Sequence, residues 1–301
     1  ENNYCEFVEM CLQSEKGKRH LDKLKFENDS LLHAALYSKK KSSMNQDLEM
    51  YKVLLRNGCS INEYNYDMLF LISAIRKGQD KLANFIIDNE ACNLNAASSE
   101  SYETPLSTAI EEGNLKLARK MLDKKCDVNV GVEGPVSMAI KEENVEALKL
   151  LIEYGCDVNV ESSEGFGRFN QPLIVAVKRK NLDLVKTLIN ASGCDVNIMD
   201  PKTQRTAISF AVEQNDSDII DLLLQKDCNI NIGRDPPLVS AIANSNLSAV
   251  KKILQSSKCK INTTEVQRAV FNCKDGDILK VLLQKGFDVN SYTDNGFTLI
   301  H

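Results

Sequence analysis

A short pattern recurs along the chain at an interval of about 33 residues. Seven cysteines lie 33, 34, 30, 38, 34 and 31 residues apart, and each is followed three residues later by an asparagine. The seven are Cys59, Cys92, Cys126, Cys156, Cys194, Cys228 and Cys259, and an eighth copy, Phe287 to Asn290, lacks only the cysteine. This period is the length of one supersecondary unit, so the chain is expected to stack copies of that unit instead of folding around one globular core.

A second pattern, ending in alanine, runs in phase with the first. Clear copies are Ser30–Ala35, Thr104–Ala109, Gly134–Ala139, Gln171–Ala176, Thr206–Ala211 and Pro236–Ala241, and weaker copies end at Ala74 and Ala269. Thr104 can cap a helix whose first residue is Pro105, and Gly113 can end that helix. Apolar residues at three- to four-residue spacing from Val145 to Ile152 indicate a second, amphipathic helix. Each unit is therefore expected to be a helix pair that buries its apolar faces by stacking.

These two phased patterns resemble those of the ankyrin-repeat family over about residues 28–301. The resemblance implies an all-α solenoid of stacked helix-turn-helix units with protruding, hairpin-like fingers. It also implies a concave surface of short inner helices and finger tips, with which members of the family mostly bind other proteins. The histidine of the family's Thr-Pro-Leu-His motif survives only as His33 and His301. We therefore expect fewer hydrogen bonds between repeats and a lower stability than in a consensus array.

The expected organisation has three parts. Residues 1–27 form a degenerate N-terminal capping repeat, residues 28–295 form eight repeats, and residues 296–301 begin a ninth. The eight repeats are expected at about 28–65, 66–98, 99–132, 133–162, 163–200, 201–233, 234–263 and 264–295. Because a last repeat without its second helix exposes apolar surface, we expect the natural protein to continue beyond residue 301.

Composition and motifs disfavour catalysis, metal binding and membrane insertion. The net charge of −5 is mild, so bulk charge does not indicate a nucleic-acid binder, and no apolar stretch is long enough to span a bilayer. The segment Gly165–Asn170 lacks the third glycine of a dinucleotide fingerprint, and the three histidines are scattered. We expect no enzyme activity, no cofactor and no metal.

The ten cysteines include no Cys-x-x-Cys pair. Their regular spacing favours small buried residues of the repeat over metal ligands or redox groups, because free cysteine packs as a small hydrophobe. Free thiols also indicate a reducing compartment, which means the cytoplasm or the nucleus.

Partner contacts are expected where stacking does not need the residue, at the finger tips and the exposed ends of the inner helices. The charges there are acidic in the third and fourth repeats and basic in the fifth and sixth, and aromatic residues beside arginine are typical interface anchors. The expected contact residues are Tyr64, Tyr66, Tyr102, Glu111, Glu112, Phe166, Arg168, Phe169, Lys178, Arg179, Lys202 and Arg205. The competing interpretation is that the charged residues among them only contact solvent.

Two functions compete on the sequence alone. The first is a scaffold or adaptor that binds another protein or peptide. The second is a regulatory or sensory segment of a larger enzyme or ion channel, in which the array packs against its own protein or holds a small ligand. Binding of nucleic acid is disfavoured because no known reader motif is present.

Asparaginyl hydroxylation is a further expectation that comes from the family resemblance. Known substrates favour a leucine eight residues before the asparagine, a spacing that Leu151 with Asn159 and Leu282 with Asn290 match. The alternative is that these asparagines only stabilise a turn.

Overall fold

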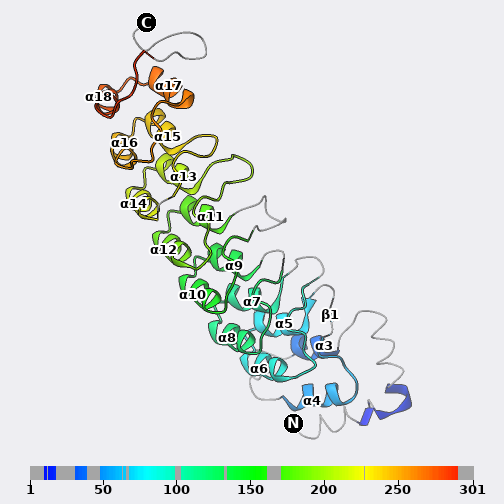
Figure 1. Ribbon diagram of the computed structural model, residues 1–301. Helices are drawn as coiled ribbons and strands as arrows, with labels where there is room; N and C mark the ends of the chain where they lie inside the picture. The colour runs from blue at the N-terminus through cyan, green and yellow to red at the C-terminus, as the bar shows by residue number, and fades with distance from the viewer. Residues whose placement is uncertain are drawn as a thin grey trace. The chain divides into compact units, whose positions relative to one another are not determined.

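The computed structural model describes residues 10–11, 13–17, 31–38, 48–62, 64–65, 68–98, 103–131, 134–160, 171–226 and 228–290. The chain divides into two compact units, Glu1–Cys156 and Asp157–His301, and each unit is described by itself. The described parts of both units consist of short helices joined by turns, which confirms the expected all-α repeat fold (Figure 1).

Unit 1 holds two rows of helices. The first helices of its pairs are α3 (Leu31–Ser38), α5 (Phe70–Arg76), α7 (Pro105–Glu111) and α9 (Pro135–Lys141), and the second helices are α4 (Glu49–Arg56), α6 (Asp80–Asp88), α8 (Leu115–Asp123) and α10 (Val145–Glu153). Each first helix contacts its own second helix and the next first helix along the row. A short antiparallel hairpin, β1 (Tyr64–Asn65) and β2 (Met68–Leu69), precedes α5 and pairs Tyr64 with Leu69.

Unit 2 repeats the arrangement. Its first helices are α11 (Pro172–Lys178), α13 (Ala207–Glu213), α15 (Pro237–Ala243) and α17 (Thr264–Phe271), and its second helices are α12 (Leu182–Asn190), α14 (Ser217–Gln225), α16 (Leu247–Ile253) and α18 (Gly276–Gln284). First helices contact first helices and second helices contact second helices from one end of the unit to the other. The apolar faces of neighbouring pairs therefore share one continuous core.

Local sequence explains where the helices begin. Thr104 accepts the N–H of Ser107 and forms a capping box with it, and Pro105 is the first residue of α7, as predicted. Every second helix from α8 to α18 begins after an Asn or Asp whose side chain accepts the N–H three residues on. These N-caps are Asn114, Asn144, Asn181, Asp216, Asn246 and Asp275. α10 covers the amphipathic stretch from Val145 to Ile152, also as predicted.

The alanine that ends each motif lies at the centre of the core. Ala109, Ala139, Ala176 and Ala211 have no exposed surface. A small side chain there lets neighbouring first helices pack closely, and larger buried side chains of the same helix, such as Leu106 and Ile110 in α7, fill the remaining space. A larger residue at these positions would force the helix rows apart.

Little of the expected capping segment, residues 1–27, lies in the described part of the chain. Residues 10–11 and 13–17 are described, and Met10 is 69% exposed. The boundaries of the eight repeats stay a proposal based on the sequence.

Candidate functional site

The repeated asparagine joins neighbouring repeats through its side-chain amide. The Nδ2 of Asn231 donates to the carbonyl of Lys258 at 2.8 Å, and its Oδ1 accepts the N–H of Lys260 at 2.8 Å. Asn62, Asn159 and Asn262 make the same pair of bonds, and Asn95 and Asn197 accept the corresponding N–H. The asparagine therefore does more than support its own turn, because it bonds the backbone of the following repeat.

The two predicted hydroxylation sites differ in their surroundings. Asn159 is half-buried, and its amide bonds the carbonyl of Gly193 at 2.8 Å and the N–H of Asp195 at 2.9 Å. Asn290 is exposed, and its backbone N–H donates to the carboxylate of Asp288 at 2.9 Å. Hydroxylation at either residue stays a prediction.

His33 is fully buried in α3, with its ring 5.3 Å from that of Phe70 in an edge-on arrangement. Burial lowers the pKa of the imidazole to about 4, although hydrogen bonds with the backbone of Met68 and Leu69 oppose the shift. The neutral ring is thus a packing element that links α3 to the start of the following helix pair.

The repeated cysteines line the turns between repeats. Cys59, Cys126 and Cys228 are buried, whereas Cys92, Cys156, Cys194 and Cys259 are half-buried. Burial raises the pKa of Cys92, Cys126, Cys194 and Cys259 to about 11, so these thiols are protonated and poorly reactive at neutral pH. Across the described residues, no three His, Cys, Asp or Glu side chains gather in a way that could hold a metal ion.

The finger between α12 and α13 is built around Asp200. Its Oδ1 accepts the N–H groups of Lys202 and Thr203, both at 3.0 Å, and its own N–H donates to the carbonyl of Arg205 at 2.9 Å. Burial by itself would raise the pKa of Asp200, but the hydrogen bond from Lys178 and those backbone N–H groups outweigh burial and hold the pKa below its usual value. The carboxylate is therefore ionised at neutral pH and fixes the shape of this finger.

A single aromatic ring supports two cations beside this finger. Lys178, the last residue of α11, places its Nζ 2.6 Å from the Asp200 carboxylate and 4.3 Å from the ring centre of Phe210 in α13. The guanidinium of Arg205 lies 4.9 Å from the same ring. Contacts of this kind are attractive because the face of an aromatic ring is electron-rich.

Arg205 is also held by two carboxylates. Its Nη1 is 2.9 Å from Glu213 and its Nε is 3.8 Å from Asp235. The Arg205 side chain is only 15% exposed, whereas those of Glu213 and Asp235 are 51% and 50% exposed. We call Lys178, Asp200, Arg205, Phe210, Glu213 and Asp235 the Phe210 cluster. In this cluster the charged groups of Lys178 and Arg205 lie over the ring, and the carboxylates of Glu213 and Asp235 are about half exposed.

The acidic residues predicted in unit 1 have a partner as well. Arg76, at the end of α5, forms ion pairs with Glu103 at 2.7 Å and Glu111 at 3.2 Å, so a cation of one repeat binds two carboxylates of the next. Glu112 caps the C-terminus of α7 and is exposed. Tyr64 is 39% exposed, and its hydroxyl donates to the carbonyl of Ala97 at 3.2 Å.

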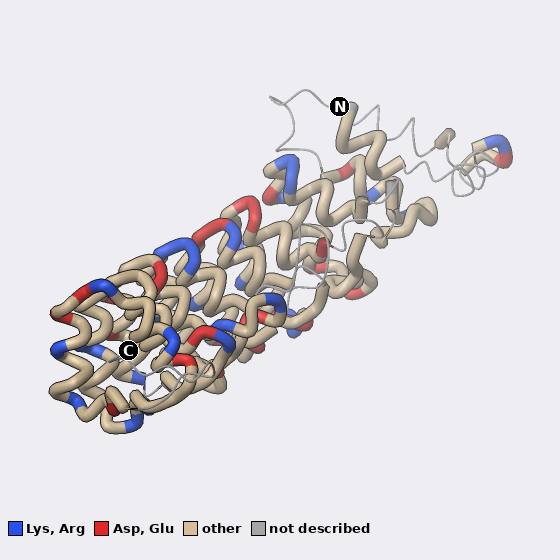
Figure 2. Tube along the Cα trace, turned by 90° about the horizontal axis from the view of Figure 1, so that it is seen from above, with Lys and Arg blue, Asp and Glu red and all other residues tan. Residues whose placement is uncertain are grey.

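The remaining predicted contact residues divide into two groups. Arg179 and Lys202 are exposed at the end of α11 and on the Asp200 finger. Tyr66, Tyr102, Phe166, Arg168 and Phe169 lie outside the described residues. Figure 2 shows Lys and Arg interspersed with Asp and Glu along the described helices of each unit. The repeats expected to be acidic or basic therefore also carry residues of the opposite charge.

Sequence reasoning missed the residues that neutralise the predicted cations. Asp200, Phe210 and Asp235 were not expected at this surface, and neither was Arg76 beside Glu111. Phe210 precedes the buried motif alanine and therefore suggested only a core residue. The one available signal was the carboxylate at Asp200, six residues before Thr206, the N-cap of α13.

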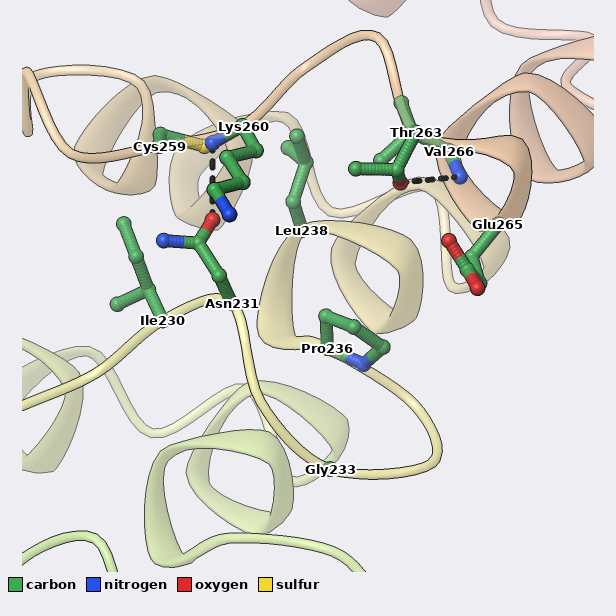
Figure 3. Close-up of a pocket in the computed structure, with 10 residues that line it drawn as sticks. All are labelled: Ile230, Asn231, Gly233, Pro236, Leu238, Cys259, Lys260, Thr263, Glu265 and Val266. Atoms are coloured by element: carbon green, nitrogen blue, oxygen red, sulfur yellow. Dashed lines mark hydrogen bonds between the residues drawn. The ribbon is translucent and has the colours of Figure 1, made fainter.

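A small pocket lies where the turn before α15 and the start of α15 meet the start of α17 (Figure 3). Its volume is about 110 Å³, and Ile230, Pro236, Leu238 and Val266 supply much of its apolar lining. Pockets for drug-sized ligands and cofactors hold about 300 to 1,000 Å³. This hollow is therefore of a size to receive one side chain.

The described helices are too short, or too polar, for any of them to traverse a bilayer.

A family profile described as ankyrin repeats (3 copies) matches residues 71–162 and 173–265. A solved structure of an ankyrin repeat protein superimposes with a TM-score of 0.55 at 20% identity, covering 62% of this chain and 97% of that one. That likeness shows the fold alone.

Two curated proteins share a shorter segment. The chain is 30% identical over 121 residues to an ankyrin repeat and KH domain-containing protein of Caenorhabditis briggsae, which covers 39% of this chain and 4% of the relative. It is 30% identical over 122 residues to alpha-latrocrustotoxin-Lt1a of Latrodectus tredecimguttatus, covering 38% of this chain and 9% of the toxin. The similarity thus spans less than a tenth of either relative.

Proposed function

Because the chain belongs to the ankyrin-repeat family, we propose that it binds another protein through its fingers and the C-terminal ends of its first helices. Ankyrin repeats are generally protein-binding modules and are typically non-catalytic, so catalysis is not expected of this segment. The observation that carries the proposal is that a charged residue stands two positions after five of the eight motif alanines: Arg76, Glu111 and Lys141 in unit 1, and Lys178 and Glu213 in unit 2. Stacking of the helices does not need charge at these positions, whereas a partner can recognise it.

The contact residues are best sought among the exposed members of the predicted set. Lys178 and Arg205 already hold Asp200, Glu213 and Asp235, so changing them would disturb the finger as well as a partner. Arg179 and Lys202 are exposed and flank the Phe210 cluster, so a partner can reach their side chains. Tyr64, Tyr66, Tyr102, Glu111, Glu112, Phe166, Arg168 and Phe169 complete the proposed surface.

Affinity purification with the whole chain tests this surface. We expect Arg179→Glu combined with Lys202→Glu, and separately Phe166→Ala combined with Arg168→Glu, to reduce recovery of the main protein partner at least tenfold. Lys251→Glu combined with Lys280→Glu makes the same change of charge on the exposed faces of α16 and α18 and should leave recovery unchanged. Undiminished recovery with both test variants would refute the placement of the surface.

The second candidate is a regulatory segment of a longer enzyme or channel. It is favoured by the curated relatives, of which the matched segment covers only 4% and 9%. In that case the partner is another domain of the same polypeptide, and cross-linking of the natural full-length protein should join residues near Arg179 or Lys202 to that domain. Cross-links only to separate proteins would favour the adaptor.

Two smaller proposals accompany this function. The free cysteines are compatible with a reducing compartment, so we place the protein in the cytoplasm or the nucleus. Hydroxylation at Asn159 and Asn290 is tested by intact-mass spectrometry of the protein from animal cells, where the absence of any added oxygen would remove the proposal.

A further inference from the structure

The fingers of unit 2 shorten from one repeat to the next. Eight residues separate the bridging Asn197 from the N-cap of α13 at Thr206, and four separate Asn231 from the N-cap of α15 at Pro236. Asn262 is followed directly by Thr263, the N-cap of α17, so this junction has no finger at all.

Where two fingers are present, they pair edge to edge. The N–H of Arg234 donates to the carbonyl of Gln204 at 2.8 Å, which joins finger 231–236 to finger 199–206. The approach is so close that a Cβ on Gly233 would lie 2.9 Å from the Gln204 oxygen. Ile232 and Gly233 make no backbone hydrogen bond to any other residue that the structure describes, so their peptide groups are available for further pairing.

The missing finger leaves the hollow drawn in Figure 3. Ile230 and Pro236 line it from finger 231–236 and its approach, Leu238 from α15 and Val266 from α17. Its volume of about 110 Å³ is several times the roughly 10 to 15 Å³ that one water molecule needs, which leaves room for one aliphatic side chain. Polar residues complete the lining, but a hydrocarbon group that packs against these four apolar side chains is favoured over water at that part of the wall.

Two charges lie at the rim of the hollow, and only one of them is satisfied. Glu265, at the start of α17, is held by its own backbone N–H and by the hydroxyl of Thr263, and the positive charge of Arg268 also stabilises its carboxylate and lowers its pKa. Lys260 is exposed and forms no ion pair with a described residue. The charge left for a ligand to neutralise is therefore positive.

We propose that an extended segment of the protein partner occupies the place of the missing finger. One aliphatic side chain of that segment enters the hollow between Leu238 and Val266, and a neighbouring carboxylate binds Lys260. Its backbone pairs with the peptide groups of Ile232 and Gly233, in the way that a peptide adds a strand to an open edge. This inference rests on the proposed protein-binding function and names one site and one class of ligand for it.

Selection from a phage-displayed random 12-residue peptide library against the whole chain tests the proposal. We expect enriched peptides to contain an aliphatic residue next to Asp or Glu, and to bind Lys260→Glu at least tenfold more weakly by fluorescence polarisation. Lys251→Glu, the same change on the exposed face of α16, is the matched control and should bind normally. Repeating the selection on Lys260→Glu should enrich Lys or Arg in place of the acidic residue.

Hydrogen exchange provides the structural readout. Bound peptide should slow exchange at the amides of Ile232 and Gly233, and this protection should disappear with Lys260→Glu. Peptides that protect α11 and α13 instead, and bind Lys260→Glu as tightly as the natural chain, would overturn this site while leaving the protein-binding function intact. Failure to enrich any sequence would also overturn it, whereas the affinity purification described above judges the broader function independently.

Discussion

Single polar side chains carry much of the connection between repeats. The amide of each bridging asparagine reaches the following repeat, and Asn231 makes both of its bonds at 2.8 Å. A hydrogen bond of this kind stabilises a protein by about 1 kcal/mol net, so an array with several such bridges depends on them appreciably.

Replacing Asn231 with alanine should lower the free energy of unfolding by about 2 kcal/mol, because two hydrogen bonds that contribute about 1 kcal/mol each are lost. Urea unfolding followed by circular dichroism measures the change. Asn190→Ala, at the exposed end of α12, is the control and should change stability by less than about 0.5 kcal/mol. Equal effects of the two substitutions would contradict the bridging role.

His33 should make stability depend on pH in the mildly acid range. Its pKa is about 4 in the folded protein and 6.5 ordinarily, so the unfolded chain takes up the proton first as the pH falls. The contribution is complete above pH 6.5, shrinks as the pH drops toward 4, and at pH 5 the loss is about 2 kcal/mol. Urea unfolding at pH 7 and pH 5 measures it, with His33→Gln as the reference that lacks the titrating ring. Identical pH dependence of the two proteins would exclude this role.

The Phe210 cluster shows what residue-level sequence reasoning could and could not provide. Lys178 and Arg205 were predicted at the surface because they stand at the end of a helix and in a finger. Their carboxylate partners could not be predicted, since Asp200 lies 22 residues after Lys178 and Asp235 lies 30 residues after Arg205. Only the packing of adjacent repeats brings these groups within bonding distance.

At the scale of elements, the helices were readily predicted and the fingers were not. Thr104, Pro105 and the apolar spacing from Val145 to Ile152 determine local helix boundaries, which do not depend on distant residues. The fingers take their shape from neighbours: the turn at Asp200 depends on Lys178, and finger 231–236 depends on Gln204. These contacts between fingers, unlike helix caps and the repeated asparagine, leave no local signature in the sequence.

Glycine is required at positions 233 and 286 for different physical reasons. Both have φ near +90°, but a Cβ on Gly233 would lie 2.9 Å from the Gln204 carbonyl oxygen, whereas a Cβ on Gly286 meets nothing within 4 Å. We expect Gly286→Ala to destabilise by about 1 kcal/mol through backbone strain alone. Gly233→Ala should cost about 1 to 3 kcal/mol more, because it also separates the two fingers. Denaturant unfolding of both variants measures the difference, and equal losses would rule out a close contact between fingers.

At the scale of the whole molecule, the loss of the motif histidine should limit stability. Ser107 takes its place in α7 and bonds only within its own cap, to Thr104, whereas Ser209 in α13 reaches the carbonyl of Asp235 in the next finger at 2.8 Å. In the described residues, this position therefore bonds the next repeat from α13 but not from α7, although other contacts such as the asparagine bridges still join repeats.

We accordingly expect thermal unfolding well below the 90 °C that marks hyperstable proteins, and spread over more than one step. Calorimetry together with circular dichroism tests both expectations. A single cooperative transition above that temperature would show that the serines replace the histidine fully. Restoring histidine at Ser107 should raise the first transition if the missing bonds are the cause.

The bridging asparagines have a consequence for how such a chain can evolve. Each amide contacts only main-chain atoms of the next repeat, such as the carbonyls of Ala91, Gly193 and Lys258, and every amino acid supplies a main-chain carbonyl. A duplicated or transplanted repeat can therefore accept these hydrogen bonds whatever side chains it carries. The array can grow or shrink by whole units, and its exposed fingers can diverge toward new ligands, without any matching change in the neighbour that holds them.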